Sequence, residues 1–312
     1  NLQPVKGAVM TKNDITRGLI DFAVSQCLKN IKEDPYRSIR RLADLGRQFA
    51  KGRFQEELFS LFQRLLLNED GPYYEMLKQL VSSVDTDSLK TLGINIGYNS
   101  WTCGASRLRQ ITAEKDYPHW LAEISLSPES SASQLKEQLS AALKNGTYAF
   151  RLHLPAQSIT TDTRQLGLIR EFPDCSFFLD FMDTDCTYSD DLLELTCSCD
   201  NLAFLVPFGS LQSRQLVDLL NARQRIYGVC RTYDNTNAAE RISDSQISEM
   251  LSWGSPLLFF LAAADTTQDN RLLVDNAILD ARLHQTYPAL LIHLDADVAR
   301  IQQLLLSSRK NL

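Results

Sequence analysis

The apolar positions of this chain change their period once, close to residue 118. Before about residue 88 the apolar side chains recur every three or four positions, which is the spacing of one face of a helix. Beyond Pro118 they gather in short runs of strand length, each followed by a stretch with helical spacing. The pattern predicts a helical subdomain over residues 1–91 and an α/β domain over residues 119–312, with a connecting segment over residues 92–118.

The first part of the chain carries four apolar stripes, and each predicts a short helix. Proline follows Asp34 and Gly71, where the first turn of a helix accepts it, and Asp34 is placed to cap the helix that it precedes. The stripes span Ile15–Ile31, Ile39–Phe49, Phe54–Leu65 and Tyr73–Leu80.

The second part carries six apolar runs that alternate with helical stretches, as in repeated βαβ units, and this alternation predicts mostly parallel strands. Runs such as Phe177–Leu179 and Leu257–Leu261 are apolar at every position, which is typical of strands covered on both faces in barrels and doubly wound sheets. The six runs are Trp120–Leu126, Thr147–Leu154, Cys175–Met182, Asn201–Pro207, Arg225–Cys230 and Pro256–Ala262. A further run, Ala289–Leu294, is either an extra strand or a packed extension.

The connecting segment is rich in glycine, asparagine and aromatic residues, and the helical period stops there. Glycine permits backbone conformations that other residues resist, and Asn, Thr and Trp side chains form hydrogen bonds without bearing charge. One interpretation is a packed linker between the two parts of the chain. The other is a loop that closes over the mouth of a barrel and supplies Asn99, Trp101 and Thr102 to a ligand.

Composition and charge argue against a nucleic-acid-binding, membrane-spanning or secreted protein. The chain is 44% hydrophobic and 22% charged, which is ordinary globular usage, and its net charge of −6 with scattered basic residues argues against nucleic acid. The longest apolar run, Leu257–Ala264, is shorter than the ~20 residues of a membrane-spanning helix. Residues 1–11 do not resemble a secretory signal, and seven cysteines, an odd number, fit reduced thiols better than a disulfide framework. We therefore expect a cytoplasmic protein of bacterial type that binds neither nucleic acid nor membrane.

Polar residues that follow the predicted strands are the first candidates for a site, because ligands of parallel α/β sheets bind outside the carboxyl ends of the strands. Asp180, Asp183 and Asp185 could share a proton or hold a hard cation, or the last two could cap the next helix. His153 could act as a general base or ligand, or be a satisfied polar residue near the barrel mouth. The full set is His153, Asp180, Asp183, Asp185, Arg231, Tyr233, Asp234 and Asp265.

Cysteine spacing gives little support to a metal site. Cys175, Cys186, Cys197 and Cys199 fall in one stretch, but Cys175 begins a predicted strand whereas Cys186 follows its other end, and no C-x2-C pair exists. Small buried thiols explain them better. The sequence also lacks the motifs of nucleophile-elbow hydrolases, P-loop nucleotidases, dinucleotide-binding enzymes and zinc proteases.

Three patterns in the first part of the chain resemble the helical leader of a group of bacterial radical S-adenosylmethionine (radical SAM) proteins. They are Asp34-Pro-Tyr-Arg-Ser-Ile-Arg-Arg-Leu-Ala-Asp-Leu, Leu67-Asn-Glu-Asp-Gly-Pro-Tyr-Tyr and Val84-Asp-Thr-Asp. The resemblance covers most of the chain and implies an α/β fold with a six-unit partial (β/α) barrel after the leader, which agrees with the six predicted units.

The chain departs from that family where the family binds its cofactor. Radical SAM enzymes carry a C-x3-C-x2-C motif after the first strand, whose thiolates hold a four-iron, four-sulfur cluster. Here that place, Ser127–Gln134, contains no cysteine, and hydroxyl groups are too hard to replace thiolates on iron. The glycine-rich turn expected after the second strand is Leu154-Pro-Ala-Gln instead. We therefore expect no iron–sulfur cluster, no S-adenosylmethionine and no other metal.

These observations leave three hypotheses for function. The first is a degenerate radical-SAM-like protein that binds a small-molecule ligand or a protein partner. The second is an enzyme that uses the acids of the barrel mouth and His153 for cofactor-independent or divalent-metal-assisted chemistry on a small molecule. The third is a module whose helical leader grips a peptide. Catalytic residues are not assigned, and the residues expected to bind a ligand are Asn99, Trp101, Thr102, His153, Asp180, Asp183, Arg231 and Tyr233.

Overall fold

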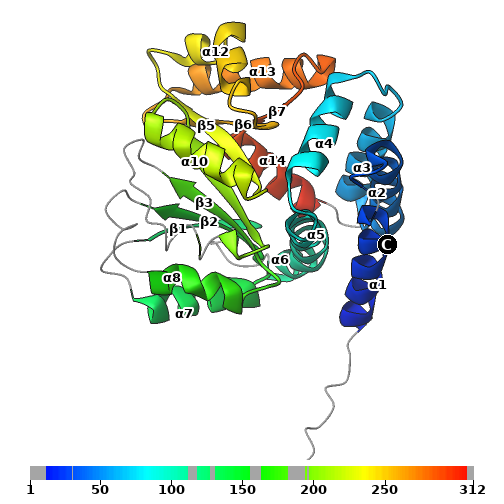
Figure 1. Cartoon of the computed structure of the whole chain (residues 1–312). Helices are drawn as coiled ribbons and strands as arrows, with labels where there is room; N and C mark the ends of the chain where they lie inside the picture. Colours follow the sequence, from blue (N-terminus) through cyan, green and yellow to red (C-terminus); the bar gives the residue numbers. More distant parts are fainter. Residues whose placement is uncertain are drawn as a thin grey trace, which may run out of the picture.

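A computed structural model shows a helical region followed by one parallel sheet that is covered by helices on both faces (Figure 1). It describes residues 12–29, 31–111, 118–126, 131–154, 163–181, 194 and 197–307. Asp183, Asp185 and Cys186, which the sequence singled out, lie outside the described residues. None of the described helices is both long enough and apolar enough to cross a membrane.

Five helices, rather than the four predicted, build the helical region. They are α1 (Lys12–Leu28), α2 (Pro35–Phe49), α3 (Arg53–Leu65), α4 (Pro72–Ser83) and α5 (Thr86–Ile94). The predicted cap is confirmed, because an Asp34 side-chain oxygen accepts a hydrogen bond from the Arg37 backbone N–H at 3.1 Å. A second aspartate, Asp85, caps α5 in the same way.

The expectation that helical structure stops in the connecting segment is wrong. The chain continues from α5 into a π-helix, η1 (Asn95–Gly104), and then into α6 (Ala105–Ile111). The glycine and asparagine residues there have weak helix propensity, but tertiary contacts override it. The Asn95 side chain donates hydrogen bonds to the carbonyl oxygens of Pro173 and Cys175, at 2.9 and 3.0 Å.

Seven parallel strands form the sheet, and their spatial order follows the chain order from β1 to β7. The strands are β1 (Leu121–Ser125), β2 (Ala149–Leu154), β3 (Ser176–Phe181), β4 (Leu202–Pro207), β5 (Tyr227–Tyr233), β6 (Leu257–Ala262) and β7 (Leu290–His293). The six predicted strands and their parallel pairing are confirmed, and the run Ala289–Leu294 contains the seventh. The result is a parallel half barrel preceded by helices.

Alternate residues of each strand supply two separate cores. The outer face carries Phe150, Phe177, Phe204 and Phe260, which are fully buried beneath the outer helices. The inner face is covered by α14 and by the α5–η1–α6 helix, as Leu294, Leu108 and Leu92 pack there. The remaining elements are α7 (Ala132–Lys144), α8 (Thr163–Gly167), η2 (Leu168–Glu171), α10 (Leu211–Ala222), α11 (Ala238–Arg241), α12 (Asp244–Leu251), α13 (Gln268–His284) and α14 (Leu294–Ser307).

Candidate functional site

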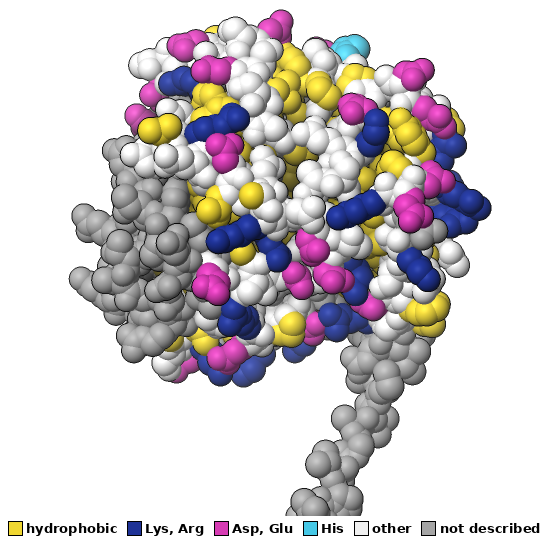
Figure 2. Space-filling view, in the orientation of Figure 1, with side chains coloured by type: hydrophobic (Ala, Val, Ile, Leu, Met, Phe, Trp, Pro, Cys, Tyr) yellow, Lys and Arg dark blue, Asp and Glu magenta, His cyan; other side chains and the backbone are white. Residues whose placement is uncertain are grey.

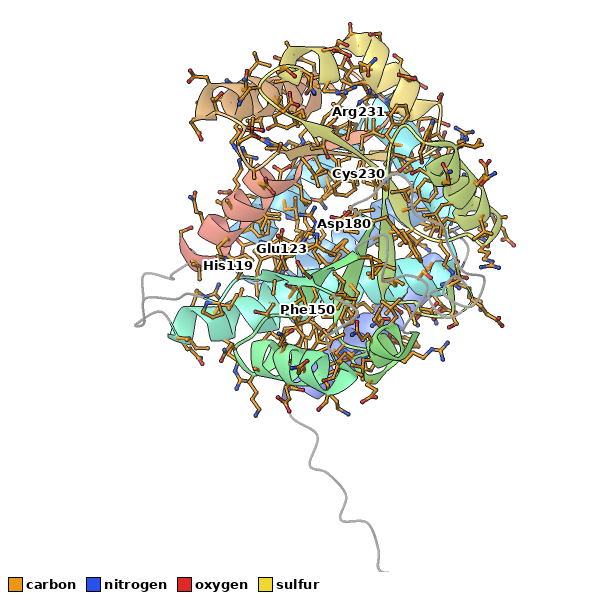
Figure 3. All side chains as sticks on the ribbon, turned by 90° about the vertical axis from the view of Figure 1, so that its left-hand side faces the viewer. His119, Glu123, Phe150, Asp180, Cys230 and Arg231 are labelled. Carbon is orange, nitrogen blue, oxygen red and sulfur yellow. The ribbon has the colours of Figure 1, made fainter. Side chains whose placement is uncertain are left out.

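Four charged residues meet on the inner face of the sheet, where β1, β2 and β3 approach their carboxyl ends. The register pairs Glu123 with Arg151 and His153 with Asp180 across neighbouring strands. Because side chains alternate between faces along a strand, these residues share one face while Phe150 and its neighbours fill the other. Figure 3 shows Glu123 and Asp180, which lie on β1 and β3 to either side of β2, with Phe150 on the side of α7.

Arg151 is the centre of this group. Its Nε and Nη2 atoms donate to one carboxylate oxygen of Asp180 at 2.9 and 2.6 Å, and its Nη1 donates to Glu123 at 3.0 Å. The side chains of Arg151 and Asp180 are only 7% and 6% exposed. Two charges buried this deeply are tolerated because each neutralises the other.

His153 completes the cluster between the two carboxylates. Its Nε2 lies 3.3 Å from Glu123 Oε2, and its Nδ1 lies 3.3 Å from Asp180 Oδ2, an ion-pair contact that falls short of hydrogen-bond geometry. The carboxylates of Asp180 and Glu123 together raise the pKa of His153 to about 9. In return, His153 and then Arg151 lower the pKa of Glu123 to about 2. At neutral pH the imidazole is therefore protonated, so it is not available as a base, and a metal ion could bind it only by displacing its proton.

A cavity of about 270 Å³ opens beside this cluster, at the carboxyl ends of β3 to β6. Three arginines, Arg151, Arg231 and Arg241, contribute to its lining, and Asp180 is the only acid among those lining residues that the structure describes. The remaining lining residues are Phe181, Pro207, Phe208, Cys230, Thr232 and Leu261. Since Asp180 is engaged by Arg151, the other two arginines carry the remaining charge among the described residues that line the cavity.

Arg231 and Arg241 are weakly neutralised. Among the described residues, Nη1 of Arg231 and Nε of Arg241 have no hydrogen-bond partner. Their ion-pair contacts are long, at 3.9 Å from Arg231 to Glu249 and 3.9 Å from Arg241 to Glu240. Burial, and after it the charge of Arg241, lowers the pKa of Arg231. Both guanidinium groups line the same cavity, and like charges there disfavour each other.

Arg231 is also held by an aromatic ring. Its guanidinium carbon lies 4.7 Å from the centre of the Phe208 ring, a cation–π geometry. Figure 3 shows Arg231 beside Cys230 on β5. On the face of the molecule seen in Figure 2, acidic and basic side chains are interspersed, so the positive charge of the cavity is a local feature.

The structure brings together three of the predicted site residues, His153, Asp180 and Arg231, and places Asn99, Trp101, Thr102 and Tyr233 elsewhere. Tyr233 is 1% exposed, and its hydroxyl lies 2.8 Å from Nε2 of His293. It belongs to a separate polar group between β5 and β7. Asp183 lies outside the described residues.

The prediction that Asn99, Trp101 and Thr102 lie over the barrel mouth is wrong. Asn99 donates a hydrogen bond to the carbonyl oxygen of Asp174, which precedes β3, so η1 lies at the amino ends of the strands. Trp101 packs edge-on against Trp120, just before β1. The loop interpretation failed because hydrogen bonds to the turn before β3 hold this segment as a helix.

Three residues of the site were missed by the sequence reasoning. Glu123 and Arg151 lie two positions before Ser125 and His153 on the inner face, and a charged residue inside an otherwise apolar strand was the available signal. Arg241 lies on the short helix α11, and only the fold shows that it approaches β5. No local pattern marks it.

The cysteines are dispersed. Cys175, Cys197 and Cys199 are buried free thiols near the amino ends of β3 and β4, and burial raises the pKa of Cys175 to about 12. Cys230 lies on the inner face next to Asp180, and burial raises its pKa well above the ordinary value. Within the described ranges, no three His, Cys, Asp or Glu side chains are placed to hold a metal ion.

Comparison of the sequence with models of known protein families finds no match, and comparison with curated proteins finds none either.

Proposed function

We propose that this chain is a binding protein for a small anionic molecule, which it holds at the mouth of the half barrel. The observation that carries the proposal is the pair Arg231 and Arg241, two weakly neutralised guanidinium groups that line one cavity. Arginine is suited to bind a phosphate or carboxylate, because its planar fork donates two parallel hydrogen bonds to such a group. The carboxyl ends of parallel strands are also the usual place for a ligand in this kind of fold.

The size of the cavity favours a small ligand. Its volume of about 270 Å³ is just below the range of roughly 300 to 1,000 Å³ that ligand pockets occupy. A phosphate group or a carboxylate on a short carbon skeleton fits this space. The ring of Phe208 and the side chain of Leu261 add apolar surface for such a skeleton.

The pairing around His153 argues against a role for this residue as a general base. A general base must be unprotonated at the working pH, and His153, with a pKa of about 9, is held as a cation between two carboxylates. The role proposed for the charged cluster is structural. Its contacts among Glu123, Arg151, His153 and Asp180 hold the Arg151 side chain and the carboxyl ends of β1 to β3 in place beside the cavity.

We further propose that the scaffold is related to radical SAM proteins and works without their cluster. The residues present do not fit a four-iron, four-sulfur cluster, which needs three thiolates at one point. Cys230 is the only thiol among the described residues that line the cavity, and Ser127–Gln134 contains no cysteine. The function proposed for the arginine pair does not depend on this relationship.

Calorimetric titration tests the proposal with inorganic phosphate and with pyruvate as a short carboxylate. We expect saturable binding of at least one of them, weakened at least tenfold by Arg241→Gln, because one guanidinium of the pair is lost. Arg37→Gln is the matched control, since it removes the same charge from an exposed position on α2. Binding that is absent for both anions, or equal in the Arg241→Gln variant and the parent protein, would contradict the proposal.

A further inference from the structure

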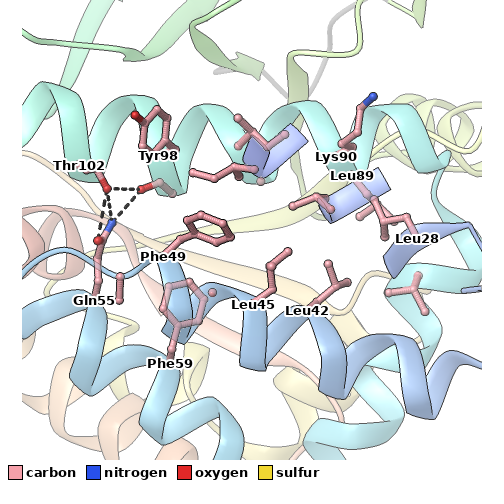
Figure 4. Close-up of a pocket in the computed structure, with 18 residues that line it drawn as sticks. Leu28, Leu42, Leu45, Phe49, Gln55, Phe59, Leu89, Lys90, Tyr98 and Thr102 are labelled. Carbon is pink, nitrogen blue, oxygen red and sulfur yellow. Dashed lines mark hydrogen bonds between the residues drawn. The ribbon is translucent and has the colours of Figure 1, made fainter. Parts of the chain in front are cut away.

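A second cavity, of about 260 Å³, lies inside the helical region, between α1, α2, α3 and the continuous α5–η1 helix. Figure 4 shows aliphatic and aromatic side chains around it, among them Leu28, Leu45, Phe49 and Phe59. None of its lining residues lines the cavity at the barrel mouth. The two cavities are therefore separate sites with opposite chemistry, one apolar and one charged.

Two glycines keep one wall of this cavity open. Gly93 on α5 and Gly97 on η1 are four residues apart, so they lie on the same side of the helix. A Cβ built on either residue would meet no atom within 4 Å. Glycine is less favourable than alanine inside a helix, so local helix stability does not explain its presence at both positions. What the two glycines provide is free volume.

The polar atoms at one end of the cavity already satisfy one another. Gln55 donates hydrogen bonds to the carbonyl oxygen of Gly97 and to the Thr102 hydroxyl, both at 2.8 Å. The Gln55 side-chain oxygen accepts from the backbone N–H of Lys51 at 2.6 Å. Figure 4 shows this group at one end and the Lys90 amine pointing outward at the other. Lys90 forms ion pairs with Asp21 and Asp87, at 3.6 and 3.9 Å.

The wall formed by η1 is itself unusual. A π-helix normally occupies a single turn and occurs often at functional sites, whereas η1 extends over 10 residues. The η1 helix lines the cavity with Gly97, Tyr98 and Thr102, and the residue just before it, Ile94, lines the cavity as well. The local geometry that directs the Gly97 carbonyl oxygen to Gln55 also leaves the space beside Gly97 open.

We infer that this cavity is a binding site for a small, neutral, apolar molecule, an aromatic system of one or two rings or a short aliphatic chain. The polar groups at its ends are already paired, so a charged or strongly polar ligand would lose hydration without gaining partners. The size agrees with this class, since an apolar cavity of about 150 Å³ is enough to bind benzene.

Fluorescence titration with prodan, a neutral probe built on a two-ring naphthalene that brightens and shifts its emission in apolar surroundings, tests the inference on the full chain. The parent protein should bind the probe saturably at one site. Gly93→Leu should weaken binding at least tenfold, because the new side chain occupies the cavity. Gly18→Leu is the matched control: Gly18 is also a helical glycine with no atom within 4 Å of its Cβ position, but it is exposed on α1 and does not line the cavity.

Val24→Phe gives an independent test, because it fills the cavity from α1 rather than from α5. Circular dichroism establishes that each variant is folded. If one of the two cavity variants, Gly93→Leu and Val24→Phe, fails to fold, the other provides the test. Loss of binding in a folded cavity variant with retention in Gly18→Leu supports the inference. Absence of saturable binding to the parent protein, or unchanged binding in a folded cavity variant, overturns it.

Discussion

Gly104 and Gly146 bring two distant stretches of backbone into direct contact. A Cβ on Gly104 would lie 2.3 Å from the carbonyl oxygen of Gly146, and a Cβ on Gly146 would lie 2.8 Å from that of Gly104. Gly146 also has a φ angle of +97°, which side-chain-bearing residues rarely adopt. The two glycines thus set how closely the end of η1 approaches the turn before β2.

Replacing Gly104 with alanine should destabilise the protein by about 2 kcal/mol, because the methyl group meets backbone that has no rotamer to change. The reference variant is Gly93→Ala, whose methyl group enters open space and should leave the free energy of unfolding unchanged or raise it by up to about 1 kcal/mol. Urea denaturation of both variants measures the difference. Equal effects of the two substitutions would refute this account of Gly104.

The charge on His153 makes stability depend on pH. Its pKa is raised from 6.5 to about 9, so its contribution is complete below about pH 6.5 and is lost as the pH rises through about 9. Stability depends on the charge of Glu123 in the opposite direction of pH. Its pKa falls from 4.5 to about 2, so its contribution to stability is present above about pH 4.5 and is lost as the pH drops through about 2. Between these limits both His153 and Glu123 carry their charges.

We expect the parent protein to exceed His153→Gln in stability by roughly 1 to 3 kcal/mol near pH 6, with the difference shrinking towards pH 10. The expected stability difference is modest because the Glu123 side chain is half-exposed, so solvent screens its interaction with His153. Denaturation across this pH range gives the two curves. His284→Gln, at a side chain that is 63% exposed, serves as control. A difference that does not vary with pH would show that His153 is not protonated in the folded state.

The sequence predicted individual site residues only where they stand at the carboxyl end of a strand. His153 and Asp180 stand at the ends of apolar runs, so the rule for parallel sheets identified them. The same rule selected Tyr233, whose side chain is directed instead to His293. Which face a side chain at a strand end takes depends on the register of its neighbours, and a single run of residues does not contain that information.

At the scale of single elements, the helix α2 has the clearest local design. Asp34 accepts a hydrogen bond from the Arg37 N–H, and Pro35 occupies the first helical position, where its missing N–H costs nothing. Both features depend on neighbouring residues alone, and both were predicted correctly.

Asp34→Ala should lower the free energy of unfolding by about 1 kcal/mol, because an amide at the start of α2 loses its acceptor. Asp34→Asn retains a side-chain oxygen and should have a much smaller effect. Thermal or urea unfolding distinguishes the two variants. Identical losses in both would mean that the charge of Asp34, and not its hydrogen bond, is what matters.

The π-helix shows the opposite case, an element that its own residues do not favour. The side chains of Asn95 and Asn99 donate hydrogen bonds to backbone carbonyl oxygens just before β3. These bonds form only when the segment is helical and packed against the turn before β3, so they stabilise the helix in the folded protein. A stretch of glycine and asparagine taken alone is typical of a turn, which is why the sequence pattern was misleading here.

Across the whole molecule, the helical region and the sheet share buried surface. Val84 and Leu92 pack against Ala203 on the inner face, and Leu108 packs beside Leu121. Hydrogen bonds also cross the boundary, as from the Asp85 N–H to the carbonyl oxygen of Gln224 at 2.8 Å. The α5–η1–α6 helix therefore acts as part of the sheet's inner core.

A fragment of residues 119–312 should consequently fail to form a stable native fold, because the apolar inner face of the sheet would lose the part of its cover that α5, η1 and α6 provide. We expect it to bind the dye 8-anilinonaphthalene-1-sulfonate strongly and to unfold without a cooperative transition. The full chain, measured alongside, should unfold in one step. Cooperative unfolding of the fragment would instead support an independent domain that begins near residue 119.

The sequence by itself determined the positions of the strands, their parallel pairing and the starts of several helices, because apolar periodicity and capping act over a few neighbouring residues. Tertiary structure alone decided that residues 95–104 are helical, that Asn99 lies at the amino ends of the strands, and that Arg241 joins Arg231 around one cavity. Each of these depends on contacts between residues far apart in the chain. Such contacts outweigh local preferences of a fraction of a kcal/mol per residue, so no short pattern reveals them.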